Sequence, residues 1–178
     1  KNVNIPSNAV VVDLEGKYIY PSFIDIHTSY GMPEAKRPPF RRGPEVIQPQ
    51  TKGAYNANDA TKSHINAVEV FKKDEKWAKS MRALGFGAVL SFHPDGLARG
   101  SSVFVSLSDE NENKLVLKGK AAAHYSFNRG TSTMNYPSSI MGYVALLRQT
   151  QMDADWYEET GKQDFYDHGL EARKTLED

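Results

Sequence analysis

The chain of 178 residues contains no cysteine. Disulfide bonds, thiolate catalysis and metal sites built on cysteine are therefore excluded. The sequence also lacks any apolar run near the ~18 residues that a membrane span requires. We therefore expect a soluble protein with no membrane partner. The absence of cysteine does not decide between a cytoplasmic and a periplasmic location.

An excess of charge of one sign is lacking too, because 22 Lys and Arg residues balance 22 Asp and Glu residues. Proteins that bind nucleic acid usually carry a basic excess or a basic face. Basic and aromatic residues are also not interleaved as an RNA-binding surface requires. These absences argue against nucleic acid as a partner.

Compact metal-ligand motifs are missing as well. The chain has five histidines but no His-x-His, His-Glu-x-x-His or Asp-x-Asp-x-Asp-Gly set. The sequence shows no internal repeat and no low-complexity tract. We therefore expect no bound metal in this chain taken alone.

The most informative stretch that is present covers residues 10–31. An extended run leads into the turn Glu15–Lys17, and a second extended run from Tyr18 to Thr28 carries His27 to its C-terminal end. Side chains on a strand alternate between its two faces. One face of the second run therefore carries Phe23, Asp25, His27 and Ser29, and the other carries Ile24, Ile26 and Thr28.

This stretch resembles the opening of the amidohydrolase superfamily, metal-dependent hydrolases that include imidazolonepropionase and dihydroorotase. In that family a Val-Asp-x-x-Gly-Lys segment leads into Pro-Gly-Phe-Ile-Asp-x-His-x-His. The order and spacing of the motif are matched by Pro21, Phe23, Ile24, Asp25 and His27. Further similar pieces follow in the family's order and extend the resemblance over most of residues 10–157. The motif's glycine is replaced by Ser22 and its second histidine by Ser29.

The resemblance implies a TIM-like (β/α) barrel whose two motif histidines bind a catalytic metal. By that analogy His27 is a candidate metal ligand, and Asp25 is the residue that orients it. Ser29 then replaces a ligand, and a hydroxyl is a poor ligand for zinc. A zinc-like divalent metal is compatible with the full-length protein. The family's other ligands are a Lys or Glu on strand four, histidines on strands five and six and an Asp on strand eight. They would lie beyond Asp178.

The length is sufficient for one sizeable core but not for a closed barrel, which needs about 250 residues. We therefore expect an excised piece of a longer protein. Residues 1–20, read as short strands and turns, are expected to be the tail of a small β-sandwich domain. Residues 21–178 are expected to be the first part of a barrel, truncated at the C-terminus. Its partners would be the remainder of its own barrel and a small-molecule substrate, and an oligomer is compatible with the sequence.

Hydrophobic periodicity predicts a helix-to-strand unit after the first barrel strand. Asn58 or Asp59 can cap a helix that extends to about Leu84, either unbroken or divided into two helices. Gly85 is suited to end it. The apolar run 86–93 then predicts a strand parallel to the one that carries His27.

The second half of the chain combines strands and helices. Alternating apolar residues around a polar turn predict that residues 102–107 and 113–123 form a hairpin excursion. Residues 96–102 are read as a surface loop. Pro137 suits the first turn of a helix that opens at residues 135–139. The expected fold class is therefore α/β, a partial barrel with a β-sandwich tail and a hairpin.

Two further histidines are candidates for contact with a substrate. His93 and His124 each stand at the end of a predicted strand, where barrel enzymes place their chemistry. The alternative for His93 is a role in stabilising the turn that follows it.

Two functions of different class follow from these observations. The first is an amidohydrolase-like, metal-dependent hydrolase that acts on amide or cyclic amide C–N bonds, of which this fragment would be an inactive part. The second is a degenerate, non-catalytic barrel that serves as a binding or scaffolding domain. Ser29 favours the second, and the shared fold does not decide between them.

Overall fold

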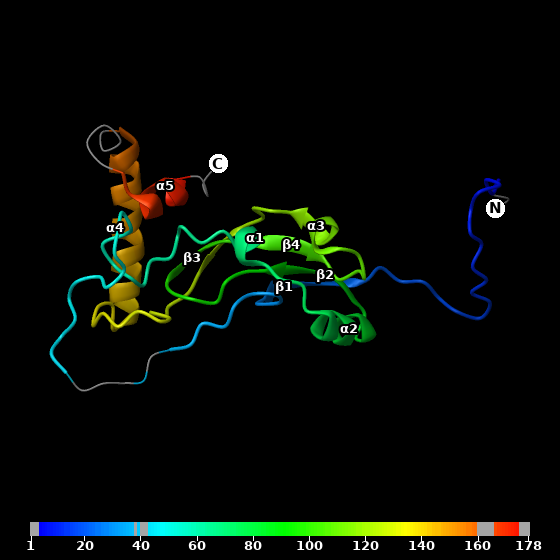
Figure 1. Cartoon of the computed structure of the whole chain (residues 1–178), viewed down its shortest axis with the longest axis horizontal. Helices are drawn as coiled ribbons and strands as arrows, with labels where there is room; N and C mark the ends of the chain where they lie inside the picture. The colour runs from blue at the N-terminus through cyan, green and yellow to red at the C-terminus, as the bar shows by residue number, and fades with distance from the viewer. Residues whose placement is uncertain (1–3, 38, 40–42, 160–165, 175–178) are drawn as a thin grey trace.

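The computed structural model describes residues 4–37, 39, 43–159 and 166–174 and has a mixed α/β architecture (Figure 1). A sheet occupies the middle of the molecule, helix α4 stands at one end, and the N-terminal segment extends from the other. No helix among the described residues is both long and apolar enough to cross a bilayer. The elements are β1 Phe23–Thr28, α1 Ala67–Val70, α2 Glu75–Ala83, β2 Phe86–Ser91, β3 Ala98–Ser101, β4 Val103–Ser106, α3 Glu112–Leu115, β5 Val116–Lys118, β6 Ala123–Tyr125, α4 Ile140–Glu159 and α5 His168–Lys174.

The central sheet has the order β1-β2-β4-β5. Strands β1 and β2 are parallel, with Phe23 opposite Phe86 and Thr28 opposite Ser91, which confirms the predicted pairing. Strand β4 lies antiparallel to β2 on its other side. Within the part of the chain that the structure describes, β1 is therefore an edge strand. The C-terminal ends of β1 and β2 lie next to each other.

The predicted hairpin is confirmed, with an addition. Strand β5 pairs antiparallel with β4, and Phe104 lies opposite Lys118. The short helix α3 lies in the connection between them. Val103, Val105 and Leu107 all face the core and are fully buried, as the alternating pattern requires. The core that they enter also contains Tyr30, Phe71 and Val89.

The prediction that residues 96–102 form a surface loop is wrong. This segment contains β3, which pairs antiparallel with β6 in a second sheet of two strands. Leu97 and Ala98 are buried, and the Ser101 amide donates to the Ile65 carbonyl at 3.0 Å. Glycine and serine, which are frequent in loops, here allow the backbone of residues 60–66 to lie close to the strand.

The prediction of a helix that starts at Asn58 or Asp59 is also wrong. The alternative of two separate helices is confirmed. The Asp59 carboxylate accepts hydrogen bonds from the amides of Gln50 and Thr51, at 2.7 and 3.2 Å, and not from a first helical turn. Short polar side chains often compete with the helix by bonding to the backbone in this way. Helices begin only at α1 and again at α2, where the Asp74 carboxylate accepts a hydrogen bond from the Trp77 amide.

Two smaller features differ from the sequence prediction, the start of a helix and the structure of the N-terminal segment. Helix α4 begins at Ile140, after residues 135–139, and the Ser139 hydroxyl accepts a hydrogen bond from the Gly142 amide at 3.2 Å. No strand is formed within residues 4–20, although short strands were expected there. A strand requires a hydrogen-bonded neighbour, and this segment is exposed, with Val10 at 90% and Tyr18 at 85% of full exposure.

Candidate functional site

The candidate site lies where the parallel strands β1 and β2 end. His27 is the fifth residue of β1 and is exposed, and Phe92 and His93 directly follow β2. The Phe92 amide donates to the Thr28 carbonyl at 3.1 Å and so holds the two strand ends together. The parallel pairing thus brings His27 and the segment after β2 to one edge of the sheet.

Phe92 is the centre of a ring cluster at this edge. Its ring is 2% exposed and meets the His27 imidazole edge-on, with 4.8 Å between ring centroids. His124, on β6, stacks on Phe92 at 4.1 Å with an interplanar angle of 15°. The Arg99 guanidinium lies 5.4 Å from the same ring. Two histidines predicted separately are therefore gathered around one aromatic ring that the sequence did not single out.

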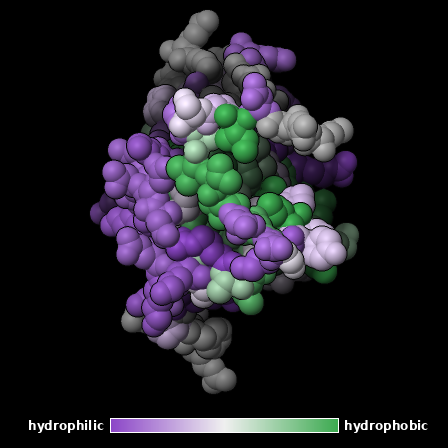
Figure 2. Space-filling view, turned by 90° about the vertical axis from the view of Figure 1, so that its right-hand side faces the viewer, coloured by the Kyte–Doolittle hydropathy of each residue, from purple (hydrophilic) through white to green (hydrophobic). Residues whose placement is uncertain are grey.

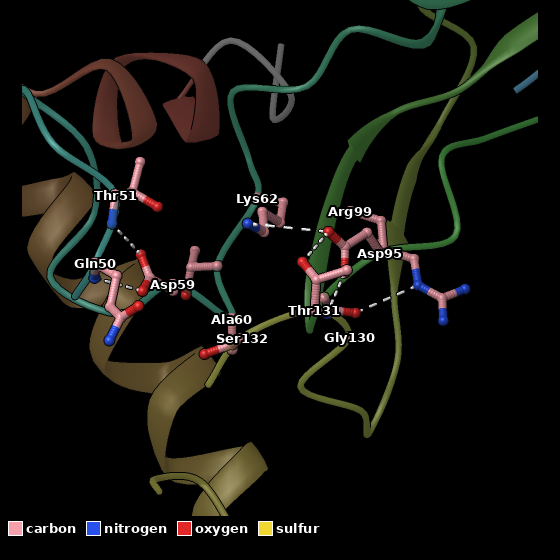
Figure 3. Close-up of polar contacts among 12 residues, drawn as sticks. Gln50, Thr51, Asp59, Ala60, Lys62, Asp95, Arg99, Gly130, Thr131 and Ser132 are labelled. Atoms are coloured by element: carbon pink, nitrogen blue, oxygen red, sulfur yellow. Dashed lines mark hydrogen bonds and ion pairs between the residues drawn. The ribbon is translucent and has the colours of Figure 1, made fainter. Parts of the chain in front are cut away.

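A buried carboxylate organises the loops beside this cluster (Figure 3). Asp95 is 5% exposed. It accepts hydrogen bonds from the Thr131 amide and the Thr131 hydroxyl, both at 2.7 Å. The Lys62 ammonium lies 3.9 Å away. Asp95 therefore ties the loop after β2 to the loops that carry Lys62 and Thr131.

Burial and neighbouring cations favour the neutral form of the two substrate-side candidates. Burial lowers the pKa of His124, and the charges of His27 and Arg99 lower it further. Burial also lowers the pKa of His93, with added effects of Lys62 and Arg99 that the Asp95 carboxylate opposes. One ring nitrogen of each, Nδ1 of His93 and Nε2 of His124, is buried without a hydrogen-bond partner in the described structure. A neutral imidazole can accept a proton from a substrate. Contact of these residues with a substrate stays a prediction.

The motif residues Asp25 and Ser29 lie close to His27 in the chain but add no ligand pair. The Asp25 carboxylate accepts a hydrogen bond from the backbone amide of His27 at 3.0 Å. An orienting contact with the imidazole stays a prediction. Among the described residues, no three or more His, Asp or Glu side chains are grouped to hold a metal. A catalytic zinc takes three protein ligands. The residues described here therefore do not fit a metal by themselves.

Sequence reasoning missed Phe92, Arg99 and the Asp95 network. The signal for Phe92 was its place directly after a predicted parallel strand. The same position made His93 a candidate. Arg99 had no such signal, because it stands in the segment read as a loop. Its position became clear only from the pairing of β3 with β6.

Comparison with known proteins gives one informative likeness. No protein-family model matches the chain, and no curated protein matches it. A solved structure, titled as an amidohydrolase from Thermotoga maritima MSB8, is similar with a TM-score of 0.63 and 20% sequence identity. The likeness covers 96% of this chain and 45% of that chain. At this identity the likeness shows a shared fold, so this chain has the α/β fold of a little less than half of that amidohydrolase.

Proposed function

We propose that the chain is part of an amidohydrolase-like, metal-dependent hydrolase that acts on amide or cyclic amide C–N bonds. The observation that carries the proposal is the position of His27. It lies at the C-terminal end of β1, which is parallel to β2, in a chain whose fold resembles part of an amidohydrolase. Barrel enzymes place their chemistry at this end of their strands. By the same resemblance, residues 21–178 correspond to the first part of a barrel and residues 1–20 to the tail of a β-sandwich.

The exposed edge of β1 supports the barrel part of this proposal. Among the described residues, β1 has a hydrogen-bonded neighbour on one side only. Its Phe23, Ile24 and Ile26 side chains are 66%, 54% and 71% exposed. Figure 2 shows hydrophobic residues gathered on the side of the molecule from which the N-terminal segment extends, bordered by hydrophilic ones. An open edge with apolar side chains normally has a further strand or a covering element. In a barrel that neighbour is another strand of the same chain.

The fragment described here is proposed to be inactive on its own. It supplies one imidazole of the metal-binding motif, that of His27, and Ser29 occupies the position of the motif's second histidine. The remaining ligands of a hydrolytic site would come from other parts of the full-length protein. Such a metal would act as a Lewis acid toward the C–N bond or its attacking water. From the residues described, His27 is the candidate ligand, and His93 and His124 are candidates for substrate contact.

A second function is favoured by a specific observation. Ser29 and the lack of a ligand group among the described residues fit a degenerate barrel that binds a ligand or scaffolds another domain. Such a protein would keep the fold and lose the chemistry. The Phe92 cluster would then have a packing role.

Metal analysis of the full-length protein tests the choice between the two functions. After purification in the presence of Zn²⁺ and dialysis, we expect bound zinc in the wild type and a clear loss in His27→Ala. Hydrolysis of a panel of amides and cyclic amides should be lost in the same variant. The matched control is His168→Ala, which changes a histidine on α5 far along the chain and should leave zinc content unchanged. Equal zinc content in the wild type and His27→Ala, with no hydrolysis in either, supports the scaffolding function.

A further inference from the structure

A pocket lined by polar residues alone adjoins the Asp95 network. Its volume is about 270 Å³, and its lining consists of Gln50, Thr51, Asp59, Lys62 and residues 131–133. Figure 3 shows most of these residues, which come from the connection between β1 and α1 and from the connection between β6 and α4. At this volume the pocket is of a size for a small polar molecule.

One negative and one positive side chain line this pocket. Asp59 is 8% exposed, and its two oxygens each accept one backbone hydrogen bond, from Gln50 and Thr51. The Thr51 side chain also hydrogen-bonds to Asp59, and since a carboxylate has about four acceptor sites, one is left for a ligand. Burial opposes ionisation, but the hydrogen bonds from Thr51 and Gln50 and the charge of Lys62 together lower the pKa of Asp59. The carboxylate is therefore charged near neutral pH and can still accept a hydrogen bond.

Lys62 supplies unused donors. Its side chain is 17% exposed, and its ammonium has an ion-pair contact with Asp95 at 3.9 Å. Within the described part of the chain, that ammonium makes no hydrogen bond. A mostly buried ammonium with unsatisfied donors is costly. A carboxylate in the pocket would satisfy them, and the hydroxyls of Ser132 and Thr133, which line the pocket, offer further donors.

We propose that this pocket binds a small zwitterion, an α-amino acid of the size of glycine, alanine or serine. The ligand's ammonium would bind Asp59, and its carboxylate would bind Lys62 and the neighbouring hydroxyls. A simple anion is disfavoured because Asp59 lines the pocket and Asp95 lies behind Lys62. A simple cation is disfavoured by Lys62. The pocket adjoins the candidate site through Lys62 and Thr131, which both contact Asp95. The proposal does not rest on the hydrolase function, because none of the rings around Phe92 lines the pocket.

Ligand titration followed by NMR chemical shifts tests the proposal on the 178-residue chain. We expect L-alanine to bind with a Kd of about 1 mM or tighter. Acetate and ethylamine, which each carry one of its charges, should bind at least about tenfold more weakly. Lys62→Met should lower the affinity for L-alanine at least about tenfold. The matched control Lys114→Met should not change binding, because that exposed lysine pairs with Glu110 outside the pocket.

A second variant keeps the test decisive if Lys62→Met does not fold. Thr133 is exposed, lines the pocket and lies on a loop. Thr133→Trp is expected to fill the pocket and abolish binding while the circular dichroism spectrum stays that of the wild type. The proposal is overturned if L-alanine does not bind, or if acetate binds as tightly as L-alanine. It is equally overturned if a folded Lys62→Met or Thr133→Trp variant binds L-alanine like the wild type.

Discussion

Replacing Gly100 by alanine is expected to lower the free energy of unfolding by about 2–5 kcal/mol. Gly100 has a φ of +74°, a conformation that costs an L-residue about 1–2 kcal/mol. A Cβ at this position would also lie 2.0 Å from the backbone oxygen of Ile65. That oxygen accepts a hydrogen bond from the Ser101 amide, so it cannot move away without breaking this hydrogen bond. Overpacking of this kind costs about 1–3 kcal/mol more.

Gly16 provides a matched control for this substitution. Its φ is also +74°, but a Cβ there would meet nothing within 4 Å. Gly16→Ala should therefore carry only the conformational cost, about 1–2 kcal/mol at most. Urea unfolding of both variants measures the difference. Equal destabilisation by the two substitutions would show that residues 60–66 do not lie against β3 as described.

Replacing Ser29 by histidine in the full-length protein is expected to raise its affinity for Zn²⁺ about a hundredfold. Four-ligand zinc sites bind with about 10–16 kcal/mol, which corresponds to roughly 3 kcal/mol for each ligand and about two powers of ten in affinity. Ser29 follows β1 two residues after His27 and is on the same face by strand alternation. An imidazole there would complete the His-x-His pair of the amidohydrolase motif.

Competition with a metal chelator of known affinity measures this change. Ser22→Gly is a useful companion variant, because it restores the other departure from the motif without adding a ligand. It should leave zinc affinity unchanged. If Ser29→His leaves both metal content and hydrolytic activity as they are in the wild type, the non-catalytic barrel is the better account of this protein.

The unit from β1 to β2 could be predicted because its signals are local and agree with one another. The apolar runs, the intervening helix pattern and Gly85 all pointed to parallel strands. The structure has that pairing, with Gly85 at φ +92° after α2. The hairpin of β4 and β5 was predictable for the same reason, since alternation marked the faces of both arms.

The region from residue 50 to residue 66 could not be predicted, because its polar side chains bond to backbone groups beyond their own turn. Asp59 binds the amides of Gln50 and Thr51. The Asn58 side-chain amide donates to the Tyr136 carbonyl at 3.0 Å, across 78 positions of sequence. From local propensity such residues are predicted to be helix caps. In the structure their side chains instead form tertiary hydrogen bonds that fix the loops. The ring cluster was missed for the same reason, because β6 brings His124 to Phe92 only through pairing with β3.

Hydrogen exchange of β1 tests the central claim, that this chain is the first part of a barrel, most directly. In the 178-residue chain, the amides of residues 23–28 that face the open edge should exchange rapidly, because β2 is the only strand that pairs with β1 among the described residues. In the full-length protein the same amides should exchange at least about tenfold more slowly, since a further strand would pair with that edge. Rapid exchange of the open-edge amides in both proteins would contradict the barrel.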